Sequence, residues 1–134
     1  RSTLFPYTTL FRSQPLVFTG EQTPNEVADW LSRSDLFVMF SNYETACVVV
    51  MESLAAGVPV VATPTGIVPD FINDNNGQIV DFDDVDALAE KMNMMLDHLD
   101  RYDSSSIRAV AEVFRSRYVG QQFINEYNKA LGRD

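Results

Sequence analysis

The sequence predicts an α/β domain in which helices cover both faces of a parallel, partially complete doubly wound sheet. Short apolar runs alternate along the chain with segments of helical periodicity, which is the pattern of consecutive β-α units. Each run is apolar at successive positions, as in strands that are buried on both faces. The chain has 134 residues, of which 46% are hydrophobic, and this is enough for one domain with a single core.

Four strands are expected, each of them a short apolar run that ends at turn-forming residues. They comprise residues 16–18, 36–40, 58–62 and 78–80. A loop rich in proline and glycine follows the third strand, and a turn-rich link leads to the fourth. Four strands are few for a doubly wound sheet, so we expect the later part of a domain whose first strands are absent.

Local signals predict the first two helices. Thr23 as N-cap and Glu26 three residues later form a capping box, with Pro24 in the first turn. The next helix is expected over residues 47–56 and ends at Gly57, because glycine adopts the left-handed conformation that closes many helices.

Helices dominate the rest of the chain. Asp84 is expected to cap a helix that runs to about residue 99 and buries one apolar face. That face comprises Leu88, Met92, Met95, Leu96 and Leu99. The methionines in it are interpreted as core filling and not as a cofactor site. Two further amphipathic helices are expected over residues 104–118 and 121–131.

Composition and charge exclude several classes of function. The net charge of -9 argues against nucleic-acid binding, which requires clustered basic residues. No apolar run reaches the length of a membrane-spanning helix, about 18 residues. A single cysteine, Cys47, and a single histidine, His98, exclude a disulfide framework and a Cys/His zinc site. We therefore expect His98 on the surface and Cys47 in a packing role, since neither has the partners that a nucleophile requires.

An acidic segment follows the fourth expected strand. It contains Asp81, Asp83, Asp84 and Asp86. The segment lacks the glycine and the distal glutamate of a calcium-binding loop, so we interpret it as a solvated turn with a helix cap.

Residues 1–13 are expected to be foreign to the domain. They show neither helical nor strand periodicity and lack the features of a signal peptide. Thr3 to Ser13 match, residue for residue, the translation of a DNA sequence that resembles a widely used sequencing-library adapter. We therefore assign residues 1–13 to an adapter-derived segment and residues 14–134 to the domain, which would then be a fragment.

Two glutamates and a helix N-terminus form the candidate site. Glu44 lies in the loop after the second expected strand, at the carboxyl edge where open α/β sheets bind ligands. The N–H groups of Ala46, Cys47 and Val48 are free at the start of the next helix and would suit a phosphate. Glu52 lies in that helix, which is otherwise apolar on all sides. We expect its carboxylate either to face a crevice or to have a dedicated partner.

These residues suggest a nucleoside diphosphate ligand, because a carboxylate can accept hydrogen bonds from both ribose hydroxyls. The alternative makes both carboxylates structural. In that case Glu44 is a charge at a helix terminus, and Glu52 accepts a hydrogen bond from a backbone amide.

The order of residues in this region resembles the nucleotide-sugar-binding half of retaining glycosyltransferases of the GT-B type, family four. The resemblance rests on the Glu-x7-Glu spacing of Glu44 and Glu52 and on the run Ala-x-Gly-x-Pro-Val-Val-Ala at residues 55–62. It extends from residue 16 to about residue 131.

The resemblance implies a partial Rossmann-like sheet from the C-terminal domain of such an enzyme, with residues 14–134 forming part of the donor-binding domain. Glu44 would be catalytic and hold hydroxyls of the donor sugar, while Glu52 would bind the ribose. The amides of Ala46, Cys47 and Val48 would hold the diphosphate. The implied reaction transfers a sugar from a nucleotide-diphosphate sugar to an acceptor with retention of anomeric configuration.

The resemblance also implies partners and location. No metal or other cofactor is expected, and the nucleotide sugar is a substrate. The acceptor is a glycan, a lipid or a small molecule, and nucleic acid is not a partner. The enzyme would be cytoplasmic or peripheral to the inner membrane, which it would contact through the missing domain. The final helices would cross back to that domain in the intact enzyme.

Several residues depart from the family pattern. Thr45-Ala46-Cys47 replaces the common Gly-Phe-Gly, and Thr65-Gly66-Ile67 stands where a Gly-Gly pair is usual. The basic residues that clamp phosphate in the family have no match here, so the fragment alone is expected to be inactive. Two alternatives remain, namely a non-catalytic α/β module that binds a nucleotide or a partner, and a stand-alone half domain that hides its sheet edge by self-association.

Overall fold

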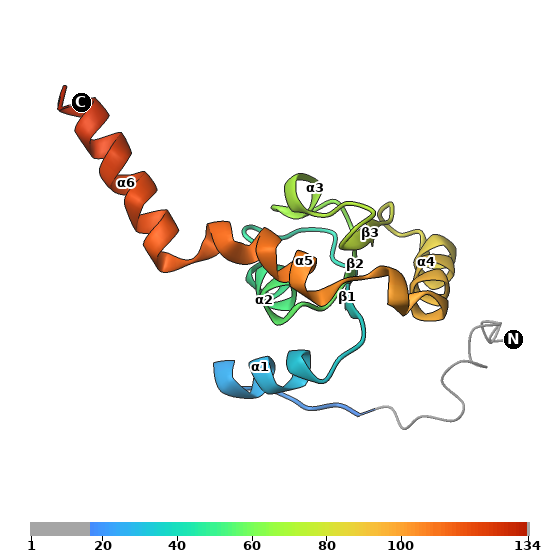
Figure 1. Cartoon of the computed structure of the whole chain (residues 1–134). Coiled ribbons are helices and arrows are strands. Elements are labelled where there is room, and N and C mark those ends of the chain that lie inside the picture. Colours follow the sequence, from blue (N-terminus) through green and yellow to red (C-terminus); the bar gives the residue numbers. More distant parts are fainter. Residues whose placement is uncertain (1–16, 134) are drawn as a thin grey trace, which may run out of the picture.

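The computed structural model describes residues 17–133 and contains a three-stranded parallel sheet with the strand order β1-β2-β3 (Figure 1). The strands are β1 (Phe37–Met39), β2 (Val60–Ala62) and β3 (Gly77–Ile79). Val60 of the central strand pairs with Phe37 on one side and with Gly77 on the other. The predicted α/β class with a parallel sheet is confirmed.

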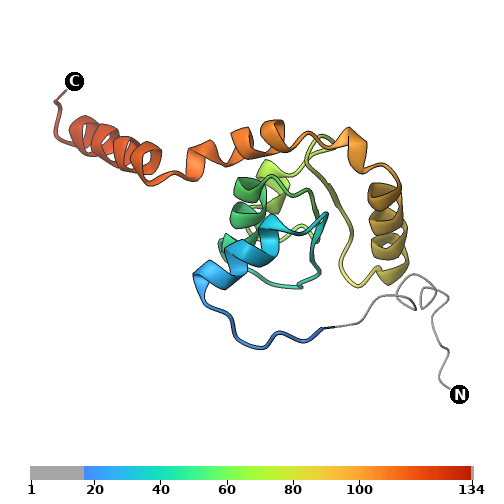
Figure 2. The same ribbon diagram turned by 60° about the horizontal axis from the view of Figure 1, so that its bottom comes forward.

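Helices cover both faces of the sheet, as predicted. The elements are α1 (Pro24–Ser32), α2 (Val48–Ala56), α3 (Val68–Phe71), α4 (Val85–Asp97), α5 (Ser104–Val110) and α6 (Ser116–Ala130). Two short 3-10 helices, η2 (Leu99–Arg101) and η3 (Ala111–Phe114), flank α5. Figures 1 and 2 show α4 on one side of the sheet and α2 on the other, with α1 lying along α2.

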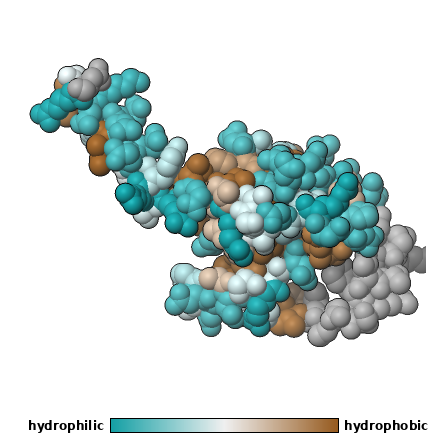
Figure 3. Space-filling view, viewed as in Figure 1, coloured by the Kyte–Doolittle hydropathy of each residue, from teal (hydrophilic) through white to brown (hydrophobic). Residues whose placement is uncertain are grey.

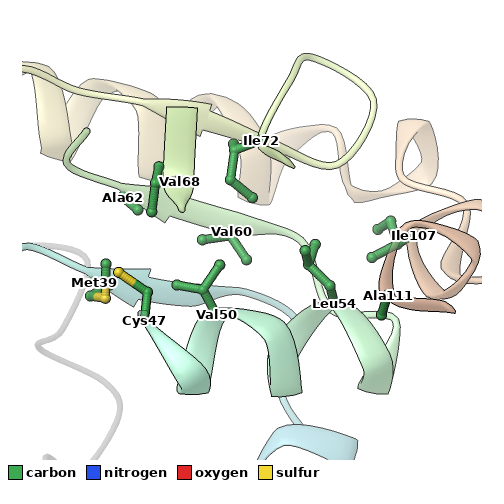
Figure 4. Close-up of a cluster of buried hydrophobic side chains, with 10 residues drawn as sticks. All are labelled: Met39, Cys47, Val50, Leu54, Val60, Ala62, Val68, Ile72, Ile107 and Ala111. Atoms are coloured by element: carbon green, nitrogen blue, oxygen red, sulfur yellow. The ribbon is translucent and has the colours of Figure 1, made fainter. Parts of the chain in front are cut away.

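The central strand β2 joins two hydrophobic clusters because successive side chains point to opposite faces of a strand. Val60 and Ala62 pack with side chains of α2, α3 and α5 (Figure 4). Val61 packs on the other face with Val80 and Met95, beneath α4. All three residues of β2 are completely buried, which explains why this strand is apolar at every position.

The predicted helix signals act as expected. The Thr23 side chain accepts a hydrogen bond from the N–H of Glu26, and the Glu26 carboxylate accepts one from the N–H of Thr23. Asp84 caps α4 by accepting from the N–H of Ala87. Gly57 ends α2 with a φ of 80°, in the left-handed region.

The predicted first strand is wrong for Val17 and Phe18, while residue 16 lies outside the described residues. The two side chains are 63% and 90% exposed and belong to no strand. A strand exists only where a neighbouring strand accepts its hydrogen bonds, and the sheet in the described part of the chain contains only β1 to β3. The assignment of residues 1–13 also lies outside the described residues and stays a prediction.

Two predictions about the later helices are also wrong. The helix expected over residues 104–118 is divided at Arg115, whose backbone is extended (φ -63°, ψ 137°). Phe114 packs its ring against Phe71, with the centroids 4.7 Å apart, and the chain turns away after this contact. Leu96 was expected on the inner face of α4 but is 39% exposed, because the narrow sheet covers only a stripe of that helix.

The last helix, α6, extends away from the rest of the molecule (Figures 1 and 3). It has no buried residue, and it runs without a break through Gly120, where a gap between two helices was expected. Among residues 17–133, no helix has the length and apolar character needed to cross a membrane.

Candidate functional site

The loops that follow the three strands meet at the carboxyl edge of the sheet. Thr63, directly after β2, is completely buried and forms hydrogen bonds with Ser41, in the loop after β1. Its Oγ1 accepts a hydrogen bond from the N–H of Ser41 at 3.2 Å and donates one to the Ser41 carbonyl oxygen. The amide of Asn42 donates to Oδ1 of Asp83, in the loop after β3, at 3.3 Å. The edge predicted to bind ligand is therefore a connected surface of three loops.

Glu44 lies in the first of these loops, two positions beyond Asn42. Its side chain is half-buried, and no hydrogen bond or ion pair joins it to another residue in the described range. A partly desolvated carboxylate without a protein partner retains its full capacity to accept hydrogen bonds. The structure thus places Glu44 at the predicted edge, with its acceptor oxygens free.

The turn before α2 presents backbone donors at the same edge. Cys47 is the N-cap residue of α2 and has a left-handed backbone (φ 48°, ψ 50°), and its side chain forms no cap hydrogen bond. The N–H groups of Ala46, Cys47 and Val48 donate no hydrogen bond to any residue in the range 17–133. Free N–H groups at the start of a helix favour an anion, both by hydrogen bonding and through the helix dipole.

Glu52 corrects one expectation about α2. The helix is not apolar and buried on all sides, because Val48 is 58% exposed and Glu52 and Ala55 are exposed as well. These three residues lie on one face of the helix, which explains why a carboxylate is tolerated there.

Glu52 faces a groove, in agreement with the first of the two alternatives considered for it. The groove has a volume of about 420 Å³ and lies between α1 and α2. Its other lining residues are Ala28, Leu31, Ser32, Ala55, Ala56 and Arg108. Glu52 makes no hydrogen bond or ion pair within the described part of the chain, so the dedicated partner of the second alternative is not seen there.

The structure brings Glu44 and the three amides together at one edge and places Glu52 one turn further along α2. Sequence reasoning missed Thr63 and Asn42, which hold the loops in register. A threonine at the end of an apolar strand is a detectable signal for the first, since a buried hydroxyl requires a partner. The contact between Asn42 and Asp83 joins residues 41 positions apart, and no local pattern indicates it.

His98 and the acidic segment, which were expected to have no role in the site, lie where the sequence predicted. His98 is exposed at the C-terminal end of α4. Asp83 and Asp84 serve a loop contact and a helix cap, respectively. In the described residues, no group of three or more His, Cys, Asp or Glu side chains is arranged to hold a metal ion.

Comparison with known proteins agrees with the family resemblance found in the sequence. The profile of the family described as "Glycosyl transferases group 1" matches residues 12–109. A GDP-mannose-dependent alpha-mannosyltransferase of Mycolicibacterium smegmatis is 32% identical over 120 residues, which are 87% of this chain and 32% of that protein. The chain spans between 14% and 32% of the length of the curated relatives it matches.

Solved structures share the fold. Sucrose-phosphate synthase from Thermosynechococcus elongatus superposes with a TM-score of 0.79 at 21% identity, over 95% of this chain and 34% of that chain. The C-terminal domain of a glycosyl transferase group 1 family protein from Francisella tularensis superposes with a TM-score of 0.52 at 26% identity, over 72% of this chain and 47% of that one. The fold is therefore that of the C-terminal half of a GT-B enzyme.

Proposed function

The chain belongs to the glycosyl transferases group 1 family, and from this premise we propose that residues 14–134 form the donor-binding part of a retaining glycosyltransferase. The intact enzyme would transfer a sugar from a nucleotide-diphosphate sugar to an acceptor. One observation carries the proposal. The half-buried Glu44 and the N–H groups that precede α2 lie together at the carboxyl edge of the sheet, without described partners. Because the mannosyltransferase relative is GDP-mannose-dependent, GDP-mannose is the first donor to test.

The N–H groups of Ala46, Cys47 and Val48 bind the diphosphate in this proposal. When the bond between the anomeric carbon and the phosphate oxygen breaks, the electron pair leaves with the nucleoside diphosphate. Donors that already point at this oxygen stabilise the developing charge without reorganisation. The bond from the acceptor oxygen forms on the same face of the sugar, which retains the configuration, and the proton of the acceptor hydroxyl passes to the leaving phosphate oxygen.

Glu44 accepts hydrogen bonds from hydroxyls of the donor sugar and is the proposed catalytic residue. Its loop is held by the hydrogen bonds of Ser41 with Thr63 and of Asn42 with Asp83, so the carboxylate has a defined position relative to the sheet. A fixed carboxylate orients the sugar so that the anomeric carbon faces the acceptor.

Glu52 accepts hydrogen bonds from the ribose hydroxyls. Its exposure on α2 supports this role, because a carboxylate that faces a groove can bind a ligand at little cost in desolvation. The order of Glu44, the amides and Glu52 along the loop and helix then follows the order of sugar, diphosphate and ribose in the donor.

Binding to the 134-residue chain tests the proposal, with each residue matched to one part of the ligand. Amide resonances of 15N-labelled protein report contact, and calorimetry reports affinity for pyrophosphate, GDP and GDP-mannose. Glu52→Gln should weaken GDP about tenfold and leave pyrophosphate unchanged, because a hydrogen bond to a charged group is worth about 1.5–3 kcal/mol and an exposed carboxylate lies at the lower end of this range. Glu44→Gln should weaken GDP-mannose and leave GDP unchanged.

Glu126→Gln provides the matched control, since Glu126 is an exposed carboxylate on α6. Repeating the titrations with 2′-deoxy-GDP isolates the ribose contact, because the Glu52→Gln effect should shrink when a ribose hydroxyl is already missing. Equal losses for pyrophosphate and GDP would refute the ribose role. Sugar transfer by an intact enzyme that carries Glu44→Gln at the wild-type rate would refute the catalytic role.

A further inference from the structure

Gly66 lies in the loop after β2 and touches the turn that carries the proposed diphosphate donors. Its φ of +51° lies in the left-handed region. A methyl group added at its Cα would lie 2.6 Å from the carbonyl oxygen of Thr45 and 2.7 Å from Sγ of Cys47. Both distances are far below ordinary van der Waals contact, so the two loops pack together here only because residue 66 has no side chain.

The side chain of Cys47 completes this contact from the other loop. The residue is only 4% exposed, and its Sγ lies 3.5 Å from the carbonyl oxygen of Thr65, to which the thiol donates. Figure 4 shows the thiol pointing inward from the start of α2, toward Ala62 and Val68. The left-handed backbone of Cys47 is therefore held by packing, because a non-glycine residue keeps such a conformation only where its surroundings enforce it.

We propose that Gly66 is a positioning residue for the diphosphate part of the site. This inference rests on the proposed function and deepens it. Gly66 allows the loop after β2 to lie directly against Thr45 and Cys47, and this contact sets the orientation of the N–H groups of Ala46, Cys47 and Val48. The family pattern commonly has glycines in the turn itself. Here the turn contains a cysteine, and the neighbouring loop supplies the space that it requires.

Gly57 provides a matched control at the opposite end of α2. It also has a left-handed backbone, with φ +80°, and an added methyl group would lie 2.7 Å from Oγ of Ser104. Gly57→Ala therefore introduces the same kind of strain and overlap without touching the turn before α2. Gly132→Ala controls for the backbone alone, since Gly132 has a φ of +63° and no neighbour within 4 Å of the added group.

The experiment compares Gly66→Ala with Gly57→Ala in the full chain. Both should lower the denaturant midpoint, because both strain the backbone. Only Gly66→Ala should shift the amide resonances of Ala46–Val48 in ligand-free protein and weaken binding of pyrophosphate and GDP, by about tenfold, as expected for donors displaced from a productive geometry. Equal effects of the two substitutions on affinity, or unchanged resonances at residues 46–48, would overturn the inference.

Cys47→Ala tests the contact from its other side and covers the case in which Gly66→Ala does not fold. Alone, it removes Sγ from the interface and should weaken GDP binding by about threefold. In the Gly66→Ala background it removes an overlapping atom and should restore part of the affinity. This reversal of sign identifies direct contact, because independent sites give additive effects. Additive losses would contradict the proposal.

The design separates failure of this inference from failure of the proposed function. If the wild-type chain binds none of the three ligands pyrophosphate, GDP and GDP-mannose, the proposal of a donor site is refuted. The amide resonances of residues 46–48 in Gly66→Ala and Gly57→Ala then still decide whether Gly66 positions the turn. If wild-type chain binds these ligands and Gly66→Ala binds them equally well, only the positioning role fails.

Discussion

Helices α2 and α6 both carry several large apolar side chains, yet only α2 buries any of its residues. In α2, Val50, Ser53 and Leu54 are completely buried against the sheet and α5. In α6 no residue is buried, although the helix is longer by six residues, 15 against 9. An amphipathic pattern shows which face of a helix can be buried, but a neighbouring element must be present for burial to occur.

The exposed apolar side chains in and just after α6 are Tyr118, Val119, Phe123, Ile124, Tyr127 and Leu131. The same segment also differs in charge from the rest of this acidic chain. Residues 115–133 carry four basic side chains and one acidic one, whereas the whole chain has a net charge of -9. The expectation that the final helices contact a further domain in the intact enzyme stays a prediction. Four experiments follow, of which two compare α6 with the body of the domain and two test caps at the starts of α1 and α5.

The largest difference is expected from truncating one apolar side chain in each region. Leu54→Ala removes a fully buried side chain from the cluster in Figure 4 and should lower the free energy of unfolding by about 2–5 kcal/mol. Phe123→Ala removes a side chain that is already exposed and should change it by less than about 0.5 kcal/mol. Denaturant unfolding measures both. A comparable loss for Phe123→Ala would show that α6 packs against the body in solution.

The second largest loss of stability is expected from removing a helix cap. Thr23→Ala removes the side-chain half of the capping box at the start of α1 and should destabilise the protein by about 1 kcal/mol. Thr19→Ala is the control, because Thr19 is an exposed threonine that precedes the helix and caps nothing. An equal effect of both substitutions in denaturant unfolding would contradict the capping role.

The start of α6 has no such cap, so a capping side chain introduced there should stabilise the helix. Arg115 occupies the N-cap position and makes no side-chain cap hydrogen bond. Arg115→Ser should stabilise α6 locally by about 0.5 kcal/mol, seen as slower amide exchange in α6 with an unchanged global midpoint. Its exposed ion pair with Glu112 is lost at little cost. Arg117→Ser makes the same change of charge inside the helix and should show no gain.

The smallest effect is a pH dependence at the start of α5. Asp103 accepts hydrogen bonds from the N–H and hydroxyl of Ser106 and from the hydroxyl of Ser105, and these lower its pKa from 3.8 to about 2. Because the folded-state pKa is the lower one, the stabilisation is present above pH 3.8 and is lost as the pH falls toward 2.

Asp103→Asn keeps an acceptor for the cap but removes this titration. The variant should therefore lose less stability than wild-type protein when the pH is lowered from 4 to 2, which acid titration of the unfolding midpoint measures. Asp100→Asn is the control on a neighbouring exposed carboxylate. Identical acid dependence of wild type and Asp103→Asn would contradict the cap.

Signals that act over a few residues were predicted correctly. The capping box of Thr23 and Glu26, the cap at Asp84 and the helix end at Gly57 all involve neighbours within one turn, and each is present in the structure. The order of the strands and the longer helices after residue 23 followed from the same local patterns, whereas the short helix α3 lies where a loop and a turn-rich link were expected. The position of Glu44 after a buried strand was sufficient to place it at the carboxyl edge of the sheet.

Features that depend on contacts between distant segments were not predictable in this way. Val17 and Phe18 have strand character but no neighbouring strand in the described part of the chain. Glu52 is exposed because α1 and α2 leave a groove between them, although its helix is largely apolar in sequence.

Some features of residues 17–133 are thus specified by the order of amino acids, and others are added by packing. The order of amino acids specifies the parallel α/β class, the helix ends at Thr23, Gly57 and Asp84, and the family, because capping, turns and hydrophobic runs act between near neighbours in the chain. Packing between loops about twenty residues apart holds Cys47 in a left-handed turn against Gly66, where an added methyl group would lie only 2.7 Å from Sγ of Cys47. Such a contact depends on where two loops meet in space, and no pattern within either loop contains that information.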